Sequence, residues 1–274
     1  MFDFWSYDFM RYAFLSALIL GPTCALLGVF VTLRGMSFFS DALAHSAVTG
    51  VALGFLVHEQ WHWQVDPFVS VLAFSFLLAS GMAWLFHKTT LKPDTVIAFA
   101  FTGSVAFGVV VISKLGKYRL LDGCLFGSIY ANGPADLWHQ GALAVVVVGL
   151  LAWQSRAYTL STLSPDLAHV QGLRTGWLNY VFALLIAATV TVCLKMLGAL
   201  LLSALIVIPP AAAKLVAQSF RQMVICSILI GLFAAGTGVI ASYHWDVPTG
   251  PCIVLTDVAC LLLCYTLHAL RKTA

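Results

Sequence analysis

Nine long apolar stretches, separated by short polar breaks, restrict this sequence to a membrane-spanning fold. A helix needs roughly 20 mostly apolar residues to cross the hydrocarbon core of a bilayer. Only 9% of the residues are charged, whereas an ordinary soluble domain carries about 25%. The sequence therefore predicts an all-α, polytopic membrane helix bundle of about eight or nine transmembrane helices. The stretches lie near residues 12–33, 36–57, 67–86, 94–114, 137–155, 177–196, 198–216, 222–243 and 250–269.

The connections between the stretches are short, which leaves no room for a soluble domain and predicts a single transmembrane domain over residues 1–274. The weakest break runs from Lys195 to Gly198, so residues 177–216 form either one span or two. The segment from Met1 to Met10 has no Lys or Arg, unlike a secretory signal, and the first stretch is expected to remain as an anchor. The seven cysteines are scattered without a C-x-x-C pair, which disfavours a zinc finger or a disulfide framework.

The positions of Lys and Arg predict the orientation in the membrane. If the break at Arg34 is cytoplasmic, nine of the 14 basic residues lie inside, and most acidic residues of the breaks lie outside. The N-terminus is then outside and the C-terminus is cytoplasmic. A net charge of only +3, with no basic run longer than two residues, excludes a nucleic-acid partner. The nine inside residues are Arg34, Lys88, Lys92, Arg156, Arg174, Lys214, Arg221, Arg271 and Lys272.

Two candidate metal ligands, Asp41 and His45, lie inside the second apolar stretch. A spacing of four residues puts both side chains on one face of a helix. An ionisable side chain in a spanning helix costs at least about 2.5 kcal/mol, so it usually faces a cavity or a partner. A carboxylate and an imidazole together suit Zn, Mn or Fe(II). The alternative is a hydrogen-bonded pair that only locks two helices together.

Three further polar residues mark the last two stretches. His244 and Asp246 end the eighth stretch at the expected outer face, where they are either metal ligands of an outer gate or part of a solvated turn. Asp257 lies seven residues into the last stretch and needs a partner there. It either orients a ligand histidine or forms a hydrogen bond with a Ser or Thr of a neighbouring helix.

The segment from His58 to His62 matches the zinc-protease motif H-E-x-x-H. In that motif the two histidines bind zinc and the glutamate, here Glu59, acts as general base. The segment lies at the expected outer end of a helix, beside Trp61 and Trp63, which are typical of an interfacial aromatic belt. The motif leaves open an intramembrane zinc metalloprotease, a metal-catching loop or an aromatic belt alone.

The expected cytoplasmic loop from Ser164 to Arg174 is polar and basic. Ser164 or Asp166 can cap a short helix that ends at Gly172. This helix is either a docking element for a partner or an ordinary connector. The chain has no G-x-x-x-x-G-K-[ST] motif for nucleotide phosphates, so an ATPase would have to be a separate subunit.

These residues resemble a known family, the zinc/manganese/iron ABC permeases of the ABC-3 type. The resemblance covers nearly the whole chain. Several matching segments in the same order along the chain are a more specific signal than any single segment. The chain departs from the pattern at Thr49, where the family commonly has Pro. Asp257 and the segment from His58 to His62 are not part of the family pattern. The matching segments are Gly35 to Phe55 with Asp41-Ala-Leu-Ala-His45, Leu91 to Thr95, Leu125 to Ser128 followed by Asp136 to Trp138, Asp166-Leu-Ala with Gly172-Leu and Leu178-Asn, Gly198 to Pro209, and Ser242 to Leu255.

The resemblance implies a permease subunit in the inner or plasma membrane that is not itself an enzyme. Two identical or paralogous chains would surround a central path, with a separate ABC ATPase that uses ATP and a periplasmic or surface-anchored metal-binding protein that delivers the ion. No cofactor would be bound permanently. Asp41, His45 and His244 would be metal-site residues. The residues themselves, rather than the resemblance, leave Asp246, Asp257, His58 and His62 open as outer or supporting positions. A coupling helix near 165–175 would contact the ATPase through Asp166, Leu167, Gly172 and Leu173.

The resemblance thus predicts import of Zn, Mn or Fe into the cytoplasm by alternating access. Three other classes remain open from the residues themselves. A secondary metal transporter would need no ATPase. An intramembrane metalloprotease would depend on Glu59, and a purely structural membrane subunit would tolerate loss of both Asp41 and His45.

Overall fold

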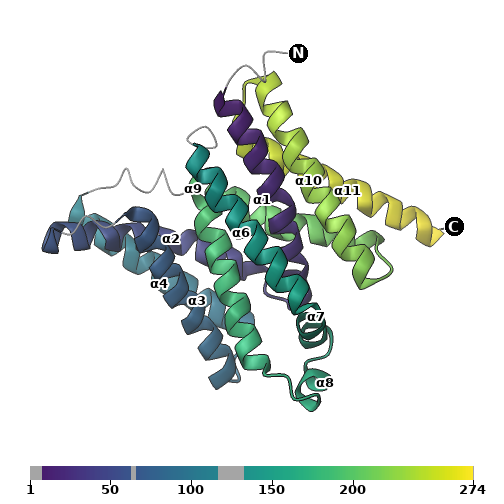
Figure 1. Cartoon of the computed structure of the whole chain (residues 1–274), viewed down its shortest axis with the longest axis horizontal. Coiled ribbons are helices and arrows are strands. Elements are labelled where there is room, and N and C mark those ends of the chain that lie inside the picture. Colours follow the sequence, from purple (N-terminus) through teal and green to yellow (C-terminus); the bar gives the residue numbers. More distant parts are fainter. Residues whose placement is uncertain (1–7, 63–65, 117–132, 274) are drawn as a thin grey trace. The chain divides into compact units, whose positions relative to one another are not determined.

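The computed structural model describes residues 8–62, 66–116 and 133–273, and every regular element in them is a helix (Figure 1). Within this part of the chain, nine helical segments are long and apolar enough to cross a membrane. The prediction of an all-α polytopic bundle is confirmed. The helices are α1 (Asp8–Leu33), α2 (Ser37–Trp61), α3 (Pro67–Lys88), α4 (Pro93–Leu115), α6 (Pro134–Trp153), α7 (Ser155–Leu163), α8 (Pro165–Val170), α9 (Thr175–Val216), α10 (Phe220–Trp245) and α11 (Thr249–Thr273).

Local sequence signals explain several helix ends. The Asp66 carboxylate accepts a hydrogen bond from the Phe68 amide at 2.8 Å and caps α3, whose first residue is Pro67. Ser219 caps α10 by accepting from the Gln222 amide. The helix α4 ends at Gly116, which has φ 66° and supplies the left-handed turn. These caps coincide with the polar breaks of the sequence.

The long helix α9 contains the break that the sequence left undecided. Gly198 has φ 70° and ψ 169°, a conformation that is open almost only to glycine. The two segments on either side, Thr175–Leu194 and Leu197–Val216, each have the length and hydropathy of a span. Residues 177–216 are therefore two candidate spans rather than one.

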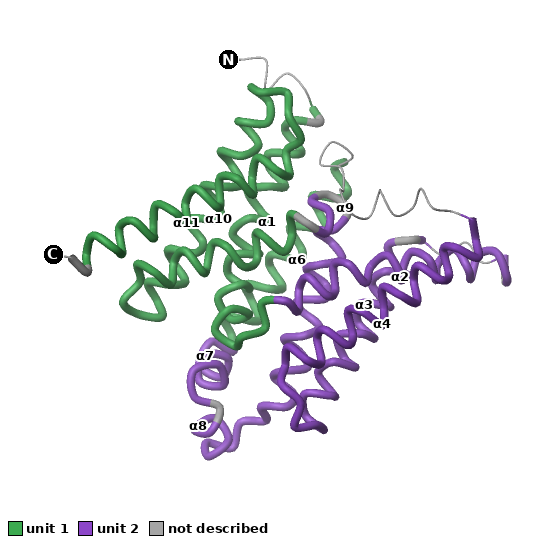
Figure 2. The backbone as a smooth tube through the Cα atoms, turned by 180° about the vertical axis from the view of Figure 1, so that it is seen from behind, with its two compact units in different colours: residues 1–37, 128–153, 201–274 green, residues 38–127, 154–200 purple. Residues whose placement is uncertain are grey.

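The chain divides into two compact units (Figure 2). Unit 1 contains residues 1–37, 128–153 and 201–274, and unit 2 contains residues 38–127 and 154–200. Each unit is built from segments far apart in the sequence. A single permease domain over the whole chain stays a prediction.

Unit 1 is held together by close packing of α10 against α1 and α11. A Cβ atom on Gly21 of α1 would lie 2.7 Å from the Gly231 carbonyl oxygen of α10, so only glycine allows this approach. The Ser227 hydroxyl donates to the Ala25 carbonyl at 3.0 Å across the same contact. Small residues and a serine hydroxyl are typical of helix packing in membranes, where backbones must come close to gain contact energy.

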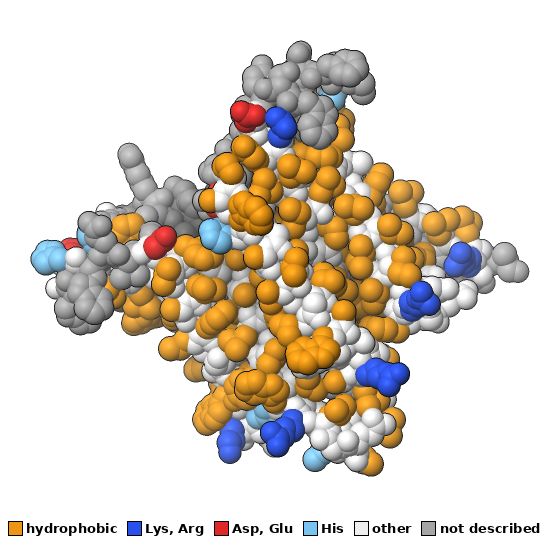
Figure 3. All heavy atoms as spheres, in the orientation of Figure 1, with side chains coloured by type: hydrophobic (Ala, Val, Ile, Leu, Met, Phe, Trp, Pro, Cys, Tyr) orange, Lys and Arg blue, Asp and Glu red, His pale blue; other side chains and the backbone are white. Residues whose placement is uncertain are grey.

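Unit 2 packs α2 against α4 through a small apolar cluster. Its buried members are Val48 and Ala52 of α2 with Val111 and Ile112 of α4. Large apolar side chains remain exposed on the outer faces of the helices in both units, and they dominate the face drawn in Figure 3. An exterior of this kind is stable in lipid, where apolar exposure carries no penalty.

Candidate metal-binding site

The pair of Asp41 and His45 is formed by one turn of α2. His45 Nε2 lies 3.5 Å from Asp41 Oδ1, and the side chains are 23% and 35% exposed, respectively. On one side the His45 ring meets the Phe101 ring of α4 edge-on, with centroids 5.6 Å apart. The pair is therefore supported by an aromatic side chain and still accessible. A carboxylate and an imidazole in this arrangement can bind a divalent transition metal.

Thr49 lies one turn beyond His45 and replaces the proline expected from the family pattern. The helix α2 continues through Thr49 without a break. The Thr49 hydroxyl donates to the Ser104 carbonyl of α4 at 2.5 Å. At this position the chain therefore gains a polar contact between the two helices that a proline side chain does not offer.

His244 lies in the last turn of α10, and Asp246 caps the same helix with φ 50°. His244 is exposed, and its Nδ1 lies 3.1 Å from the Ile240 carbonyl oxygen, a contact that orients the ring. His244 belongs to unit 1, whereas Asp41 and His45 belong to unit 2. Among the residues that the structure describes, no three His, Cys, Asp or Glu side chains gather closely enough to hold a metal ion.

Asp257 is completely buried in α11. Neither carboxylate oxygen has a hydrogen-bond partner within the described residues. Within these residues, Asp257 therefore forms no hydrogen bond to a Ser or Thr of a neighbouring helix. A buried carboxylate without a partner is costly in a low-dielectric interior, so this position calls for another explanation.

The H-E-x-x-H segment lies at the end of α2. His58 and Glu59 are exposed in its last turn, and His62 follows the helix with φ 53°. A protease-like zinc centre needs three protein ligands close together. Among the described residues, no such group of three ligands is found at this segment or elsewhere.

The loop from Ser164 to Arg174 contains the short helix α8. The helix ends at Val170, and Gly172, with φ 73°, follows as a left-handed turn, so the expected end at Gly172 is two residues too late. Ser164 is in the N-cap position without a side-chain cap bond. Ala168 is buried, whereas Leu167 is 56% and Val170 85% exposed. Asp166 is exposed and Leu173 is partly buried beside this surface.

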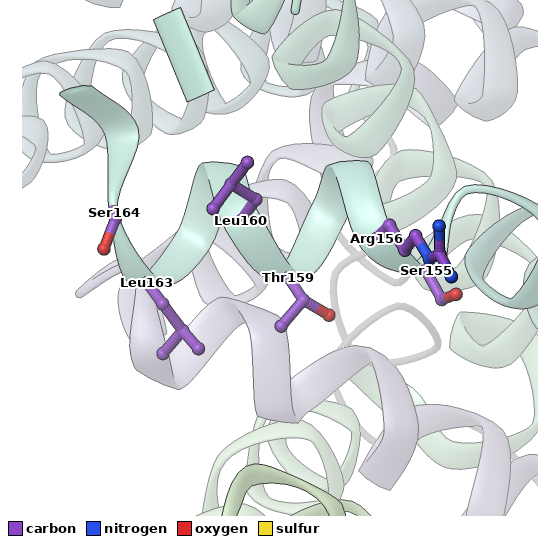
Figure 4. A pocket seen from close by; sticks show the side chains of 6 residues that line it. All are labelled: Ser155, Arg156, Thr159, Leu160, Leu163 and Ser164. Atoms are coloured by element: carbon purple, nitrogen blue, oxygen red, sulfur yellow. The ribbon is translucent and has the colours of Figure 1, made fainter. Parts of the chain in front are cut away.

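An open hollow of about 510 Å³ lies along the preceding helix α7 (Figure 4). Its lining contains one cation, Arg156, and two leucines, of which Leu163 is exposed and Leu160 is partly buried. Together with Leu167 and Val170, this hollow makes a surface with the mixed apolar and basic character of a docking site. The lining residues are Ser155, Arg156, Thr159, Leu160, Leu163 and Ser164.

The helical fold, together with a carboxylate–imidazole pair inside a spanning helix, defines a polytopic membrane permease. The chain belongs to the ABC 3 transport family, whose pattern it matches over residues 6–268. The predicted family is confirmed.

Individual relatives cover nearly the full length of the chain. It is 31% identical to the high-affinity zinc uptake system membrane protein ZnuB of Haemophilus influenzae, over 92% of this chain and 94% of that protein. It is 27% identical to the manganese import system permease protein ScaB of Streptococcus gordonii, over 94% of this chain and 91% of that protein. The solved structure of PsaBC from Streptococcus pneumoniae in complex with Fab superposes with a TM-score of 0.82 at 25% identity, over 96% of this chain and 93% of that one.

Proposed function

We propose that this chain is the permease subunit of an ATP-driven importer for a divalent transition metal, namely zinc, manganese or iron. The observation that carries the proposal is the accessible pair of Asp41 and His45 within a membrane-spanning helix. Ionisable side chains at such positions mark ion pathways. The family membership and the relatives named for zinc and manganese support the same cargo class.

The pair supplies two ligands, fewer than the four that a closed zinc site uses. A second copy of the chain, or a paralogue, placed around a two-fold axis would add the same two ligands from the other side. His244 is the further ligand or outer gate residue of this scheme. A site shared between two chains can be assembled and taken apart, which suits transient binding during alternating access.

The chain itself is a transport subunit rather than an enzyme in this proposal. A partner ATPase would hydrolyse ATP and contact the surface formed by α7 and α8. A metal-binding protein would deliver the ion at the outer face, and the chain would lie in the inner or plasma membrane with its C-terminus in the cytoplasm. The distribution of Lys and Arg supports this orientation.

Uptake of radioactive zinc, manganese and iron by cells tests the proposal. We expect Asp41→Ala and His45→Ala each to lower uptake of the cargo metal by roughly tenfold or more, because each removes one of the two ligands that the pair supplies. The matched control is Ser46→Ala, since the Ser46 hydroxyl donates only locally, to the Leu43 carbonyl. Normal uptake by both ligand variants at wild-type expression would contradict the proposal.

Two further arms of the experiment separate the other classes. Metal uptake into vesicles by the purified chain alone would identify a secondary transporter. Loss of function in Glu59→Gln, with Asp41→Ala unaffected, would identify a metalloprotease.

A further inference from the structure

A series of ring contacts inside unit 2 connects the α7 and α8 region with α2 (Figure 2). In the first contact, the Tyr158 ring of α7 packs against the Phe182 ring of α9, with centroids 6.1 Å apart. The two side chains are 0% and 1% exposed, respectively. Aromatic side chains attract one another at centroid distances of about 4.5–7 Å. The helix α7 is therefore fixed to α9 by a buried contact.

The short helix α8 is joined to the start of α9 by a compact turn. The Leu173 amide donates to the Ala168 carbonyl at 3.1 Å, and the Gly172 amide donates to the His169 carbonyl at 3.0 Å. With Gly172 at φ 73°, these two bonds form the Schellman motif that closes the end of a helix. The turn leaves few backbone torsions free before α9 begins at Thr175, so a displacement of α8 reaches the first turns of α9.

His87, in the last turn of α3, contacts these first turns of α9. Its ring stacks on the Tyr180 ring, with centroids 6.2 Å apart and planes inclined by 21°. A Cβ atom on Gly176 would lie 2.8 Å from His87 Nε2, so a glycine here leaves the space that the ring occupies. Gly176 and Tyr180 are four residues apart and share one face of α9. The histidine ring therefore fits closely against two positions of α9.

The residue before His87 continues the series of contacts to α2. The Phe86 ring lies against the Phe39 ring of α2, with centroids 6.3 Å apart and planes inclined by 42°. Phe39 is 0% exposed and precedes Asp41 by two residues in the same helix. Because a helical turn is rigid, a displacement of Phe39 also displaces Asp41 and His45. The contacts thus run from the proposed ATPase contact to the proposed metal-binding pair within one compact unit.

We propose that His87 and Tyr180 are positioning residues that transmit movement of α8 to the pair of Asp41 and His45. This inference rests on the proposed function, which supplies the ATPase contact at one end and the metal site at the other. Packed side chains and rigid helices are the physical means by which distant sites are coupled. The stack of His87 on Tyr180 is the joint between α9 and α3, and both residues act through these helices rather than by contact with the ion.

The test uses the full-length permease reconstituted with its ATPase in liposomes, with zinc, manganese and iron(II) each supplied alone. The readout is metal uptake per ATP hydrolysed, because a residue that only stabilises the fold changes the amount of active protein and not this ratio. We expect Tyr180→Ala and Gly176→Ala each to lower the ratio by at least about fivefold, the lower end of ordinary coupling between sites. The amount of ATPase that co-purifies should stay at the wild-type level.

Gly176→Ala is the milder of the two changes, since one added methyl group displaces the His87 ring without removing any side chain. Its matched control is Gly81→Ala in α3, where an added Cβ would meet nothing within 4 Å. Tyr180→Phe retains the stacked ring and should retain the wild-type ratio. The double variant His87→Ala/Tyr180→Ala should be no worse than either single variant, because all three lose the same contact.

A wild-type ratio in both Gly176→Ala and Tyr180→Ala would overturn the inference, and so would an equal loss in Gly81→Ala or Tyr180→Phe. Failure of the proposed function gives a different result. If Asp41→Ala transports metal normally, the proposed function is wrong and this inference falls with it. If Asp41→Ala loses transport while Tyr180→Ala keeps the wild-type ratio, only transmission through His87 and Tyr180 is wrong.

Discussion

At the scale of single residues, one turn of α2 sets the geometry of the candidate metal-binding pair. The four-residue spacing of Asp41 and His45 is a local property of a helix, and the structure has the two side chains in contact. The neighbours of Asp257 depend on how α10 and α11 pack, and no local pattern encodes this.

Thr49 offers a residue-scale prediction about the contact between α2 and α4. Replacing Thr49 by Val keeps the shape but removes the hydroxyl that donates to the Ser104 carbonyl. We expect a loss of about 0.5–1.5 kcal/mol in the free energy of unfolding, the usual contribution of one hydrogen bond. Thermal unfolding of the purified protein in detergent measures the change.

The control for this change is Thr102→Val in α4. Thr102 is exposed and donates only to the Ala98 carbonyl of its own helix. Equal losses in the two variants would show that the contact between α2 and α4 contributes nothing.

At the scale of elements, hydropathy predicted the spans well because a bilayer imposes one simple length requirement on every helix. The nine predicted stretches correspond to nine candidate spans within the described residues. The break at Gly198 was uncertain because a glycine between apolar residues is compatible with both a continuous and a broken helix. Only its backbone angles separate the two cases.

Packing of α1 against α10 leads to an element-scale prediction. A Cβ atom on Gly231 would lie 2.8 Å from the Ala25 Cβ and 2.9 Å from the Gly21 carbonyl oxygen. We expect Gly231→Ala to force the helices apart and lower stability by about 1–3 kcal/mol. Thermal unfolding in detergent, with expression level as a second readout, measures this effect.

Gly236 on the same helix provides the comparison, because its added Cβ would meet nothing closer than 3.7 Å. Gly236→Ala should be neutral or slightly stabilising, since alanine favours a helix by about 1 kcal/mol over glycine. If Gly231→Ala is as stable as Gly236→Ala, the close approach of the α1 and α10 backbones at Gly231 does not contribute to the stability of unit 1.

At the scale of the whole molecule, two kinds of surface differ in the polarity of their exposed side chains. Broad apolar faces suit lipid or another permease chain, whereas the α7 and α8 region combines Leu167 and Val170 with the basic Arg156. The sequence predicted a short helix here, either a docking element or an ordinary connector, but did not predict which of its side chains are exposed. The packing of the helix decides which side chains are exposed: Ala168 is buried against the protein, so Leu167 and Val170 lie on the solvent side of the helix.

The proposed ATPase contact leads to a prediction at this scale. We expect Val170→Asp to reduce co-purification of the ATPase by roughly tenfold, because a charge in the apolar part of an interface costs on the order of 1–3 kcal/mol. Thermal unfolding of the isolated permease should be unchanged, since Val170 is exposed. The control is Gln218→Asp in the exposed connection before α10, and an equal loss of ATPase there would contradict docking at α8.

The continuity of α2 has a consequence for any transport cycle. Asp41 and His45 are neighbours on one uninterrupted helix, so a rigid turn sets their separation whichever side of the membrane is open. If the pair binds the cargo ion as proposed, the backbone of α2 cannot move the two ligands apart. Release of the ion would then come from groups that approach or leave the pair, and the elements that face α2 would govern the affinity for the ion.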